Sequence, residues 1–372
     1  MKTRKIFSII IILTLFIPGL GMLTGFGDNA DSFRRHENRN KSRLEYVSPD
    51  KIPENITSWF RDSYGFRSMM IRQYSGMMRK LIPVNNSDKC VLGKDGRLFL
   101  GNSDEAVIDG FQNKIFYSSS DIDHLVKRFS ERRRLAEDIG ADYFVIFAPN
   151  KHSVYPEFLP DYILQGIQKS GNLFDDTAKS LVEKGINVTN MKHFFEKEYT
   201  KEHELLYHKT DTHWSALGAY FGYQRLMENI RSRHPEIRVM EMPVFKKSSN
   251  KEGYDLVDIC GFQGQDQDDF KMNYSLPMKN ITTTESLLDN KIQVFENPDA
   301  LNSITVMIMR DSFGIGLRPY LLFTFKRLVF IHHVAESKPG ADYKSLTMKY
   351  KPDIVIDEYV ERMVNTMLYE EQ

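Results

Sequence analysis

The chain has 372 residues, of which 41% are hydrophobic and 27% are charged. This length suits one large α/β domain, because no Pro/Gly/Ser-rich linker separates motifs that would have to meet in space. Lys plus Arg and Asp plus Glu both number 50. The formal net charge is therefore zero, which argues against a protein that holds nucleic acid through an overall positive field.

The first residues have the pattern of an export signal. Three basic residues precede an apolar stretch over residues 6–23, a length between that of a signal-peptide core and that of a membrane span. A clear Ala-x-Ala cleavage site is missing, which favours an uncleaved N-terminal membrane helix with the remainder outside the cytoplasm. We therefore predict a signal peptide or signal anchor over 1–27, a polar tether over 28–50 and one domain over 51–372.

Beyond the tether, apolar runs of strand length alternate with amphipathic helical patterns. This alternation predicts an α/β fold with a mainly parallel sheet and helices on both faces. The predicted helices cover 52–81, 122–139, 173–183 and a segment after Ser215, and the predicted strands cover 143–147, 186–188, 304–309, 328–331 and 354–356, with a glycine-turn hairpin over 91–99.

Cys90 and Cys260 are the only cysteines of the sequence. Two cysteines suit an exported chain that avoids free thiols, but they do not make a disulfide scaffold. Their separation along the chain says nothing about their distance in space. The sequence leaves open whether they pair, with two free thiols the favoured alternative.

Two segments together supply an acid, a base and a nucleophile, which is the minimum set for acyl transfer through a serine. Asp211 and His213 stand two residues apart, and Ser312 follows the apolar strand predicted over 304–309. A serine there lies at the carboxyl end of a buried strand, where ligands bind in open α/β sheets. A helix beginning at the serine could offer N–H groups to an oxyanion. The alternative is that Asp311 or Ser312 only caps that helix.

The neighbouring residues indicate whether His213 is a general base or a structural histidine. Asp211 could orient the imidazole, Trp214 could wall the site from water, and Ser215 could cap the following helix. Functional groups concentrate at such loop and helix junctions. The sequence therefore favours a catalytic His213.

Asn150 and Lys151 follow the strand predicted over 143–147, so they belong at the same sheet edge. Either could donate to an oxyanion or to a substrate group, and the alternative is a structural turn. Asp266, Asp268 and Asp269 lack the pattern of a calcium loop, so we expect a solvated acidic face. The sequence has no motif that requires a metal or another cofactor.

The segment Leu206–Tyr220 (LYHKTDTHWSALGAY) resembles the signature of the AlgJ/AlgX alginate O-acetyltransferases and of the related DHHW proteins, which are SGNH-hydrolase-like enzymes. Further segments are similar to other elements of that family, in the same order: 59–67, 91–99, 148–157, 253–256 and 351–362. Several ordered matches cover most of the predicted domain.

The resemblance implies Ser312 as nucleophile, His213 as general base and Asp211 as its orienting partner. Arg310 departs from the glycine that many relatives have at the start of the serine segment, which leaves the oxyanion geometry open. Arg310 and Trp214 therefore join Asn150 and Lys151 as candidates for substrate or oxyanion contacts.

The resemblance also implies an activity and partners. It predicts an O-acetyltransferase that passes acetyl from a serine to hydroxyls of an extracytoplasmic polysaccharide, with a membrane-bound O-acyltransferase as acetyl supplier and no nucleic acid partner. A triad serves hydrolysis equally well, so a polysaccharide deacetylase or esterase is one alternative. A non-catalytic carbohydrate-binding assembly factor on the same scaffold is the other.

Overall fold

The computed structural model describes residues 42–63, 88–103, 105–169, 171–197, 203–262 and 265–368, with isolated positions among residues 16–21 and 65–77. The predicted signal or anchor over 1–27 and most of the tether lie outside these residues, as does most of the helix predicted beyond Ser63. Within the described part of the chain, no helix combines the length and the apolar character needed to cross a membrane.

One mixed sheet organises the described chain. Within these residues it has seven strands in the order β4-β3-β11-β9-β10-β8-β7. The neighbours from β4 to β10 pair in parallel, whereas β8 and β7 pair antiparallel at one edge. The strands are β3 (Asp142–Ala148), β4 (Asn187–Asn190), β7 (Thr282–Leu287), β8 (Ile292–Glu296), β9 (Asn302–Arg310), β10 (Phe325–His332) and β11 (Ile354–Val360).

The predicted α/β class is confirmed, and the five strands expected from their apolar runs are the parallel ones. The antiparallel pair β7 and β8 makes the sheet mixed, and no strand was predicted from the sequence at either position. The reason lies in their composition. Strand β7 is a largely exposed polar run and β8 alternates with partly exposed positions, so neither has the continuous apolar pattern of a strand buried on both faces.

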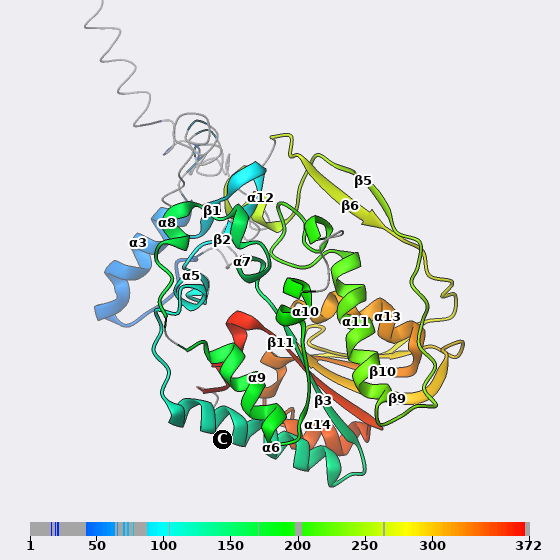
Figure 1. Cartoon of the computed structure of the whole chain (residues 1–372). Coiled ribbons are helices and arrows are strands. Elements are labelled where there is room, and N and C mark those ends of the chain that lie inside the picture. Colours follow the sequence, from blue (N-terminus) through cyan, green and yellow to red (C-terminus); the bar gives the residue numbers. More distant parts are fainter. Residues whose placement is uncertain are drawn as a thin grey trace, which may run out of the picture.

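Helices cover both faces of the sheet, with α11 (Ala216–Arg231) and α13 (Gly314–Thr324) on one side and α6 (Ser119–Glu137), α9 (Leu173–Glu183) and α14 (Tyr343–Tyr350) on the other (Figure 1). Successive side chains of β3 enter opposite cores, as a period of two requires. Phe144 and Ile146 belong to the core beneath α11 and α13, whereas Val145 and Phe147 belong to the core beneath α6 and α9.

The helices begin where side chains satisfy their first N–H groups. Ser118 and Asp121 form a capping box on α6. Asn172 caps α9, and Ser215 accepts a hydrogen bond from Gly218 N at the start of α11. The predicted capping role of Ser215 is thereby confirmed.

Smaller elements gather above the carboxyl edge of the parallel strands. Hairpin β1 (Cys90–Leu92) and β2 (Leu98–Leu100) lies at the position predicted for it, next to α12 (Asp255–Ile259), and β5 (Lys246–Asn250) pairs with β6 (Asp269–Asn273). The remaining helices are α3 (Ile52–Ser63), α5 (Val107–Phe111), α7 (Lys151–Val154), α8 (Asp161–Leu164) and α10 (Met191–Lys197), with short 3₁₀ turns that include η6 (Glu361–Leu368).

A disulfide joins Cys90 of β1 to Cys260 at the end of α12. The expectation of two free thiols was wrong. The hairpin and α12 share a small apolar core that contains Leu98, Leu100 and Leu256. This packing brings the two Cα atoms to 5.4 Å, a separation that a disulfide spans.

Candidate active site

The chemistry-bearing segments meet at the carboxyl edge of the parallel strands. Ala148 at the end of β3 pairs with Val360 at the end of β11, and β11 pairs with β9 on its other side. The segments that follow these strands therefore leave the sheet at one edge. They contain Asn150, Arg362 and Ser312.

Ser312 occupies a tight turn held by two buried carboxyl groups. Asp311 accepts hydrogen bonds from Phe313 N at 2.8 Å and from Val360 N at 2.6 Å. Glu358 accepts from Asp311 N at 3.1 Å and from Gly314 N at 3.0 Å. The turn is thus tied to β11 from both sides of the serine.

The geometry of this turn separates the two alternatives for the serine segment. Helix α13 has Phe313 at its N-cap, without a hydrogen bond from a capping side chain. Asp311 has the structural role, whereas the partly buried Ser312 hydroxyl forms no hydrogen bond within the described residues. A Cβ on Gly314 would stand 2.6 Å from Arg310 Cβ, so the close approach requires glycine there.

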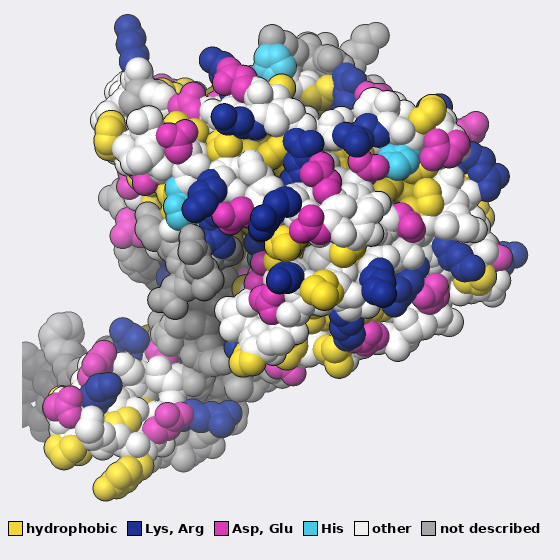
Figure 2. Space-filling view, turned by 90° about the horizontal axis from the view of Figure 1, so that it is seen from below, with side chains coloured by type: hydrophobic (Ala, Val, Ile, Leu, Met, Phe, Trp, Pro, Cys, Tyr) yellow, Lys and Arg dark blue, Asp and Glu magenta, His cyan; other side chains and the backbone are white. Residues whose placement is uncertain are grey.

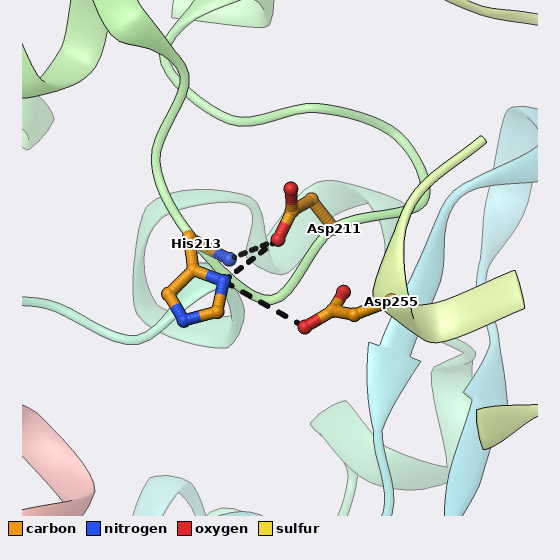
Figure 3. A group of neighbouring side chains, drawn as sticks. All are labelled: Asp211, His213 and Asp255. Atoms are coloured by element: carbon orange, nitrogen blue, oxygen red, sulfur yellow. Dashed lines mark hydrogen bonds and ion pairs between the residues drawn. The ribbon is translucent and has the colours of Figure 1, made fainter. Parts of the chain in front are cut away.

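His213 is oriented by two carboxylates on the same side of its ring (Figure 3). Asp211 Oδ1 lies 2.8 Å from Nδ1 and also accepts from the backbone N of His213 at 2.9 Å. Asp255 Oδ2 lies 3.6 Å from the same Nδ1. The other ring nitrogen, Nε2, faces away from both carboxylates, which is the orientation that a general base needs.

The carboxylates shift the proton affinities in the site. Burial opposes the charged imidazolium, but the hydrogen bond and charge of Asp211 and the charge of Asp255 outweigh it and raise the pKa of His213. Burial also acts on Asp211, where the bonds to His213 prevail and lower its pKa. Burial and the neighbouring Asp211 raise the pKa of Asp255 to about 6. Asp211 is therefore the ionised partner of the imidazole.

The loop that carries His213 is held by two further aspartates. Asp255 accepts from Thr212 N at 2.9 Å and from Thr212 Oγ1 at 2.5 Å. Asp269 accepts from Thr210 N at 2.7 Å and from Thr210 Oγ1 at 2.5 Å. The expectation that Asp269 lies on a solvated acidic face was wrong. Its side chain is buried and accepts hydrogen bonds from the backbone N–H groups of Lys209 and Thr210.

The histidine loop and the serine turn meet at Phe313, the residue after Ser312. Trp214 Nε1 donates to Phe313 O at 3.1 Å, and the rings of His213 and Phe313 are 5.1 Å apart between centroids. Trp214 is buried against this turn. No hydrogen bond joins His213 to Ser312 within the described chain. The fold thus brings the two segments into contact at Phe313.

The other predicted site residues lie around this junction. Asn150 is buried, and its Oδ1 accepts from Arg362 Nη1 at 3.0 Å. Arg310 is buried, stacks on Phe330 with its guanidinium 4.4 Å from the ring centroid, and donates to Asp311 O at 3.2 Å.

The Lys151 side chain points toward backbone carbonyl groups and does not point into solvent. Its Nζ donates to Leu98 O at 2.8 Å, Lys209 O at 2.7 Å and Asp211 O at 3.1 Å. Burial is the largest influence on this group and lowers the pKa of Lys151 to about 7. Three carbonyl acceptors use all three protons of the ammonium form, so below that pH the lysine ties hairpin β1–β2 to the histidine loop.

Asp211, His213 and Asp255 are the described residues that could hold a metal ion, because each offers an atom within 4.8 Å of the other two. One of these contacts is the hydrogen bond of 2.8 Å between Nδ1 and Asp211. That bond accounts for the closeness of Asp211 and His213, and Asp255 is held near them by its bonds from Thr212. An ion would have to replace the proton on Nδ1.

Two residues of the site were not singled out from the sequence. Asp255 lies in the segment 253–256 and Arg362 in the segment 351–362, and both segments resemble the family. Arg362 lies with its guanidinium 5.6 Å from the Phe313 ring centroid. The available signal was an aspartate and an arginine in family-like segments. Only the packing of the chain shows that Asp255 lies near His213 and that Arg362 lies near Phe313.

Comparisons with known proteins agree with this architecture. A family model described as an SGNH hydrolase-like domain of the acetyltransferase AlgX matches residues 90–284, more than half of the chain. The match includes Asp211, His213 and Asp255 but ends before Ser312. No curated protein matches the chain.

Solved structures with TM-scores above 0.5 share the fold at low sequence identity. Bacillus cereus PatB1 with a sulfonyl adduct is 15% identical with a TM-score of 0.52, over 69% of this chain and 95% of that one. A DHHW family protein from Eubacterium siraeum is 15% identical with a TM-score of 0.52, over 77% and 96%. The O-acetyltransferase domain of Pseudomonas putida AlgJ is 15% identical with a TM-score of 0.44, over 74% and 92%.

Proposed function

Because the chain belongs to the family of SGNH hydrolase-like AlgX acetyltransferases, we propose that it is an O-acetyltransferase that acts through a Ser312 acyl-enzyme on hydroxyls of an extracytoplasmic polysaccharide. The observation that supports this most directly is the Asp211–His213 pair, 2.8 Å apart, in contact with the residue after Ser312. An oriented imidazole beside a serine is the arrangement that activates a hydroxyl.

In the first half of the reaction, His213 Nε2 takes the proton of Ser312 Oγ as the oxygen attacks the acetyl carbon of the donor. The bond between acetyl and the leaving group breaks, and the leaving group receives that proton from His213. In the second half, His213 takes a proton from the sugar hydroxyl, whose oxygen attacks the acyl-enzyme. The bond to Ser312 breaks, and the proton returns to the serine. Asp211 stabilises the imidazolium at both stages.

The candidates for oxyanion donors are Asn150, Lys151, Arg310 and Trp214. Asn150 is the best supported of the four, because Arg362 binds its Oδ1 and leaves the amide Nδ2 on the opposite side. Nitrogens of Lys151, Arg310 and Trp214 donate to backbone carbonyls, which suits positioning roles. The N–H groups of Asp311, Phe313 and Gly314 already donate to the carboxyl groups of Glu358 and Asp311, so the backbone candidate in the serine turn is the N–H of Ser312.

The cellular setting follows from the sequence and the family together. We propose that the first 27 residues direct the chain out of the cytoplasm and keep it at the membrane unless they are cleaved. A membrane-bound O-acyltransferase would then supply acetyl groups across the bilayer.

Purified protein incubated with an activated acetyl ester, with and without an oligosaccharide acceptor, tests this function. Acetylated oligosaccharide that depends on Ser312 and His213 is the expected product. Release of acetate alone, at the same rate with acceptor, would identify an esterase instead. Polymer acetylation in cells that survives Ser312→Ala would show a non-catalytic assembly role and reject the proposal.

A further inference from the structure

A cleft opens at the carboxyl edge of the sheet, beside the residues that contact the serine turn. Its volume is about 50 Å³, and it opens to solvent. At about 10–15 Å³ for each water, this volume holds roughly four waters or the edge of one sugar ring. Four chain segments line it: α5 with the loop after it, Asn150, the beginning of α9, and η6.

The inner end of the cleft is shared with the candidate active site. Asn150 and Arg362 line the cleft, and the Arg362 guanidinium also lies over the ring of Phe313. The Arg362 hydrogen bond to Asn150 Oδ1 fixes the carboxamide, so the Asn150 Nδ2 group is a donor on the other side. A ligand in the cleft would thus meet donors next to Ser312.

Asn365, which follows Arg362 by three residues in η6 and also lines the cleft, has a buried acceptor without a partner in the described part of the chain. Asn365 donates from Nδ2 to Tyr117 OH at 3.3 Å, and its Oδ1 is buried with no hydrogen-bond partner within the described residues. A buried acceptor left unpaired costs about 1–3 kcal/mol. A ligand hydroxyl that donates to Asn365 Oδ1 would remove that cost.

Aromatic and carboxamide side chains contribute to the rest of the cleft lining. Phe111, Tyr117 and Phe174 supply apolar faces, and Asn172 is held by its hydrogen bond to Asn113 at 3.0 Å. Glu361 in the wall already accepts from Asn150 N at 2.8 Å and from Ser153 Oγ at 2.7 Å. Sugar rings fit such a lining, because they combine apolar C–H faces with hydroxyls that both donate and accept.

We propose that this cleft is the acceptor subsite, which seats one sugar ring adjacent to the ring that receives acetyl. The proposal depends on the transferase function and adds to it where the acceptor binds and how it is recognised. Hydroxyl groups bridge the donors of Asn150 and Arg362 and the acceptor of Asn365. The acceptor chain then runs along the carboxyl edge, from His213 toward α5.

Gly110 offers a direct test, because it lines the cleft and an added Cβ would meet no atom within 4 Å. Gly110→Leu fills the cleft, and Gly110→Ala adds a single methyl at the same position of α5. Asn365→Leu removes the buried acceptor at similar volume. Lys179→Leu is the control, on the exposed side of α9 and outside the cleft.

The measurement is the steady-state transfer of acetyl to an oligosaccharide, with KM for the acceptor and kcat determined separately. We expect Gly110→Leu to raise KM about tenfold or more and to lower kcat much less, with Gly110→Ala in between and Lys179→Leu like the natural chain. Asn365→Leu should raise KM about threefold to tenfold. Soluble yield and the melting temperature verify folding of each variant.

Unchanged KM in both Gly110→Leu and Asn365→Leu would overturn the subsite, even if Ser312→Ala still abolishes transfer. A fall in kcat with no rise in KM would overturn it as well, because the cleft would then support the catalytic edge rather than the acceptor. Transfer that persists in Ser312→Ala would reject the proposed function instead, so the two failures are distinguishable.

Discussion

His213 shows how single side chains tune the site. The proposed general base works only while its imidazole is neutral, so we expect the raised pKa of His213 to set the acid limit of activity. Asp211 provides the hydrogen bond, and Asp255 adds a second negative charge 3.6 Å from the same nitrogen. The sequence pattern identified Asp211, which is two residues from His213. It could not identify Asp255, because that contact depends on the placement of α12.

We expect kcat/KM for acetyl transfer to fall as the pH drops, with a midpoint above the ordinary histidine value of 6.5. Asp255→Asn keeps an acceptor for Thr212 but removes a charge that favours imidazolium, so the midpoint should move to lower pH. A pH–rate profile of both proteins measures the shift. The matched control is Asp266→Asn, on a side chain that is 83% exposed. A midpoint that stays in place in Asp255→Asn would contradict the electrostatic role.

Glu358 is the buried residue that holds the serine turn. Burial and the charge of Asp311 raise its pKa well above the usual carboxyl range, so the folded protein binds this proton more tightly than the unfolded chain. That contribution to stability is complete below the unfolded pKa of about 4.5 and is lost as the pH rises through the folded value.

We expect Glu358→Gln to retain stability, because the amide oxygen can still accept from Asp311 N and Gly314 N. Glu358→Ala should cost about 2–4 kcal/mol, since it leaves two buried N–H groups unpaired and a cavity. Urea unfolding at about pH 5 and pH 8 compares the variants with the natural chain. If Glu358→Gln and Glu358→Ala lower the free energy of unfolding equally, the two hydrogen bonds do not hold the turn.

At the scale of elements, the histidine loop is clamped by parts of the chain that are distant in sequence. Helix α12 carries Asp255 at its first residue and Cys260 at its end. The disulfide ties that end to β1, and Leu98 of the same hairpin donates from its N to Lys209 O at 2.8 Å. Hairpin, helix and loop therefore form one unit. The sequence predicted the hairpin and the loop before the helix that follows Ser215, but it predicted neither α12 nor this assembly.

Loss of the disulfide should weaken both stability and catalysis. The bond closes a loop of 170 residues, and removal of a native disulfide costs typically about 2–5 kcal/mol. Cys90→Ser combined with Cys260→Ser should lower the urea midpoint accordingly and reduce transfer, because α12 no longer holds Asp255 firmly. The same variants treated with reductant serve as the control, since reductant should then have no further effect. An unchanged midpoint would show that the small apolar core suffices.

At the scale of the whole molecule, charges of both signs are interspersed. Figure 2 shows Lys and Arg next to Asp and Glu over the face in view, in agreement with the zero net charge. Long-range steering of a charged polymer requires a surface of one sign. Recognition of the acceptor should therefore depend on local hydrogen bonds.

We expect kcat/KM for a neutral oligosaccharide to change less than about twofold between low and high ionic strength, because added salt screens only interactions between separated charges. Steady-state rates over a salt series measure this. A steep decline with salt would reveal a charged binding surface that the zero net charge conceals.

Patterns over short stretches of the chain are recognisable from the order of the residues. The alternation of apolar runs and amphipathic segments predicted the parallel strands and the covering helices other than α14. Ser215 was recognisable as a cap, and Asp211, His213 and Ser312 as the candidates for chemistry. These features depend on local sterics, hydrogen bonding and a period of 2.0 or 3.6 residues, which a linear sequence records directly.

Features that depend on packing between distant segments required the three-dimensional arrangement. They include the Cys90–Cys260 bond, the burial of Asp269, the approach of Asp255 to His213 and the cleft beside Arg362. Each joins residues whose separation in space is set by how hairpin, helices and sheet stack on one another. The free energy of that stacking comes from burial summed over the whole core, so no short pattern of residues encodes it.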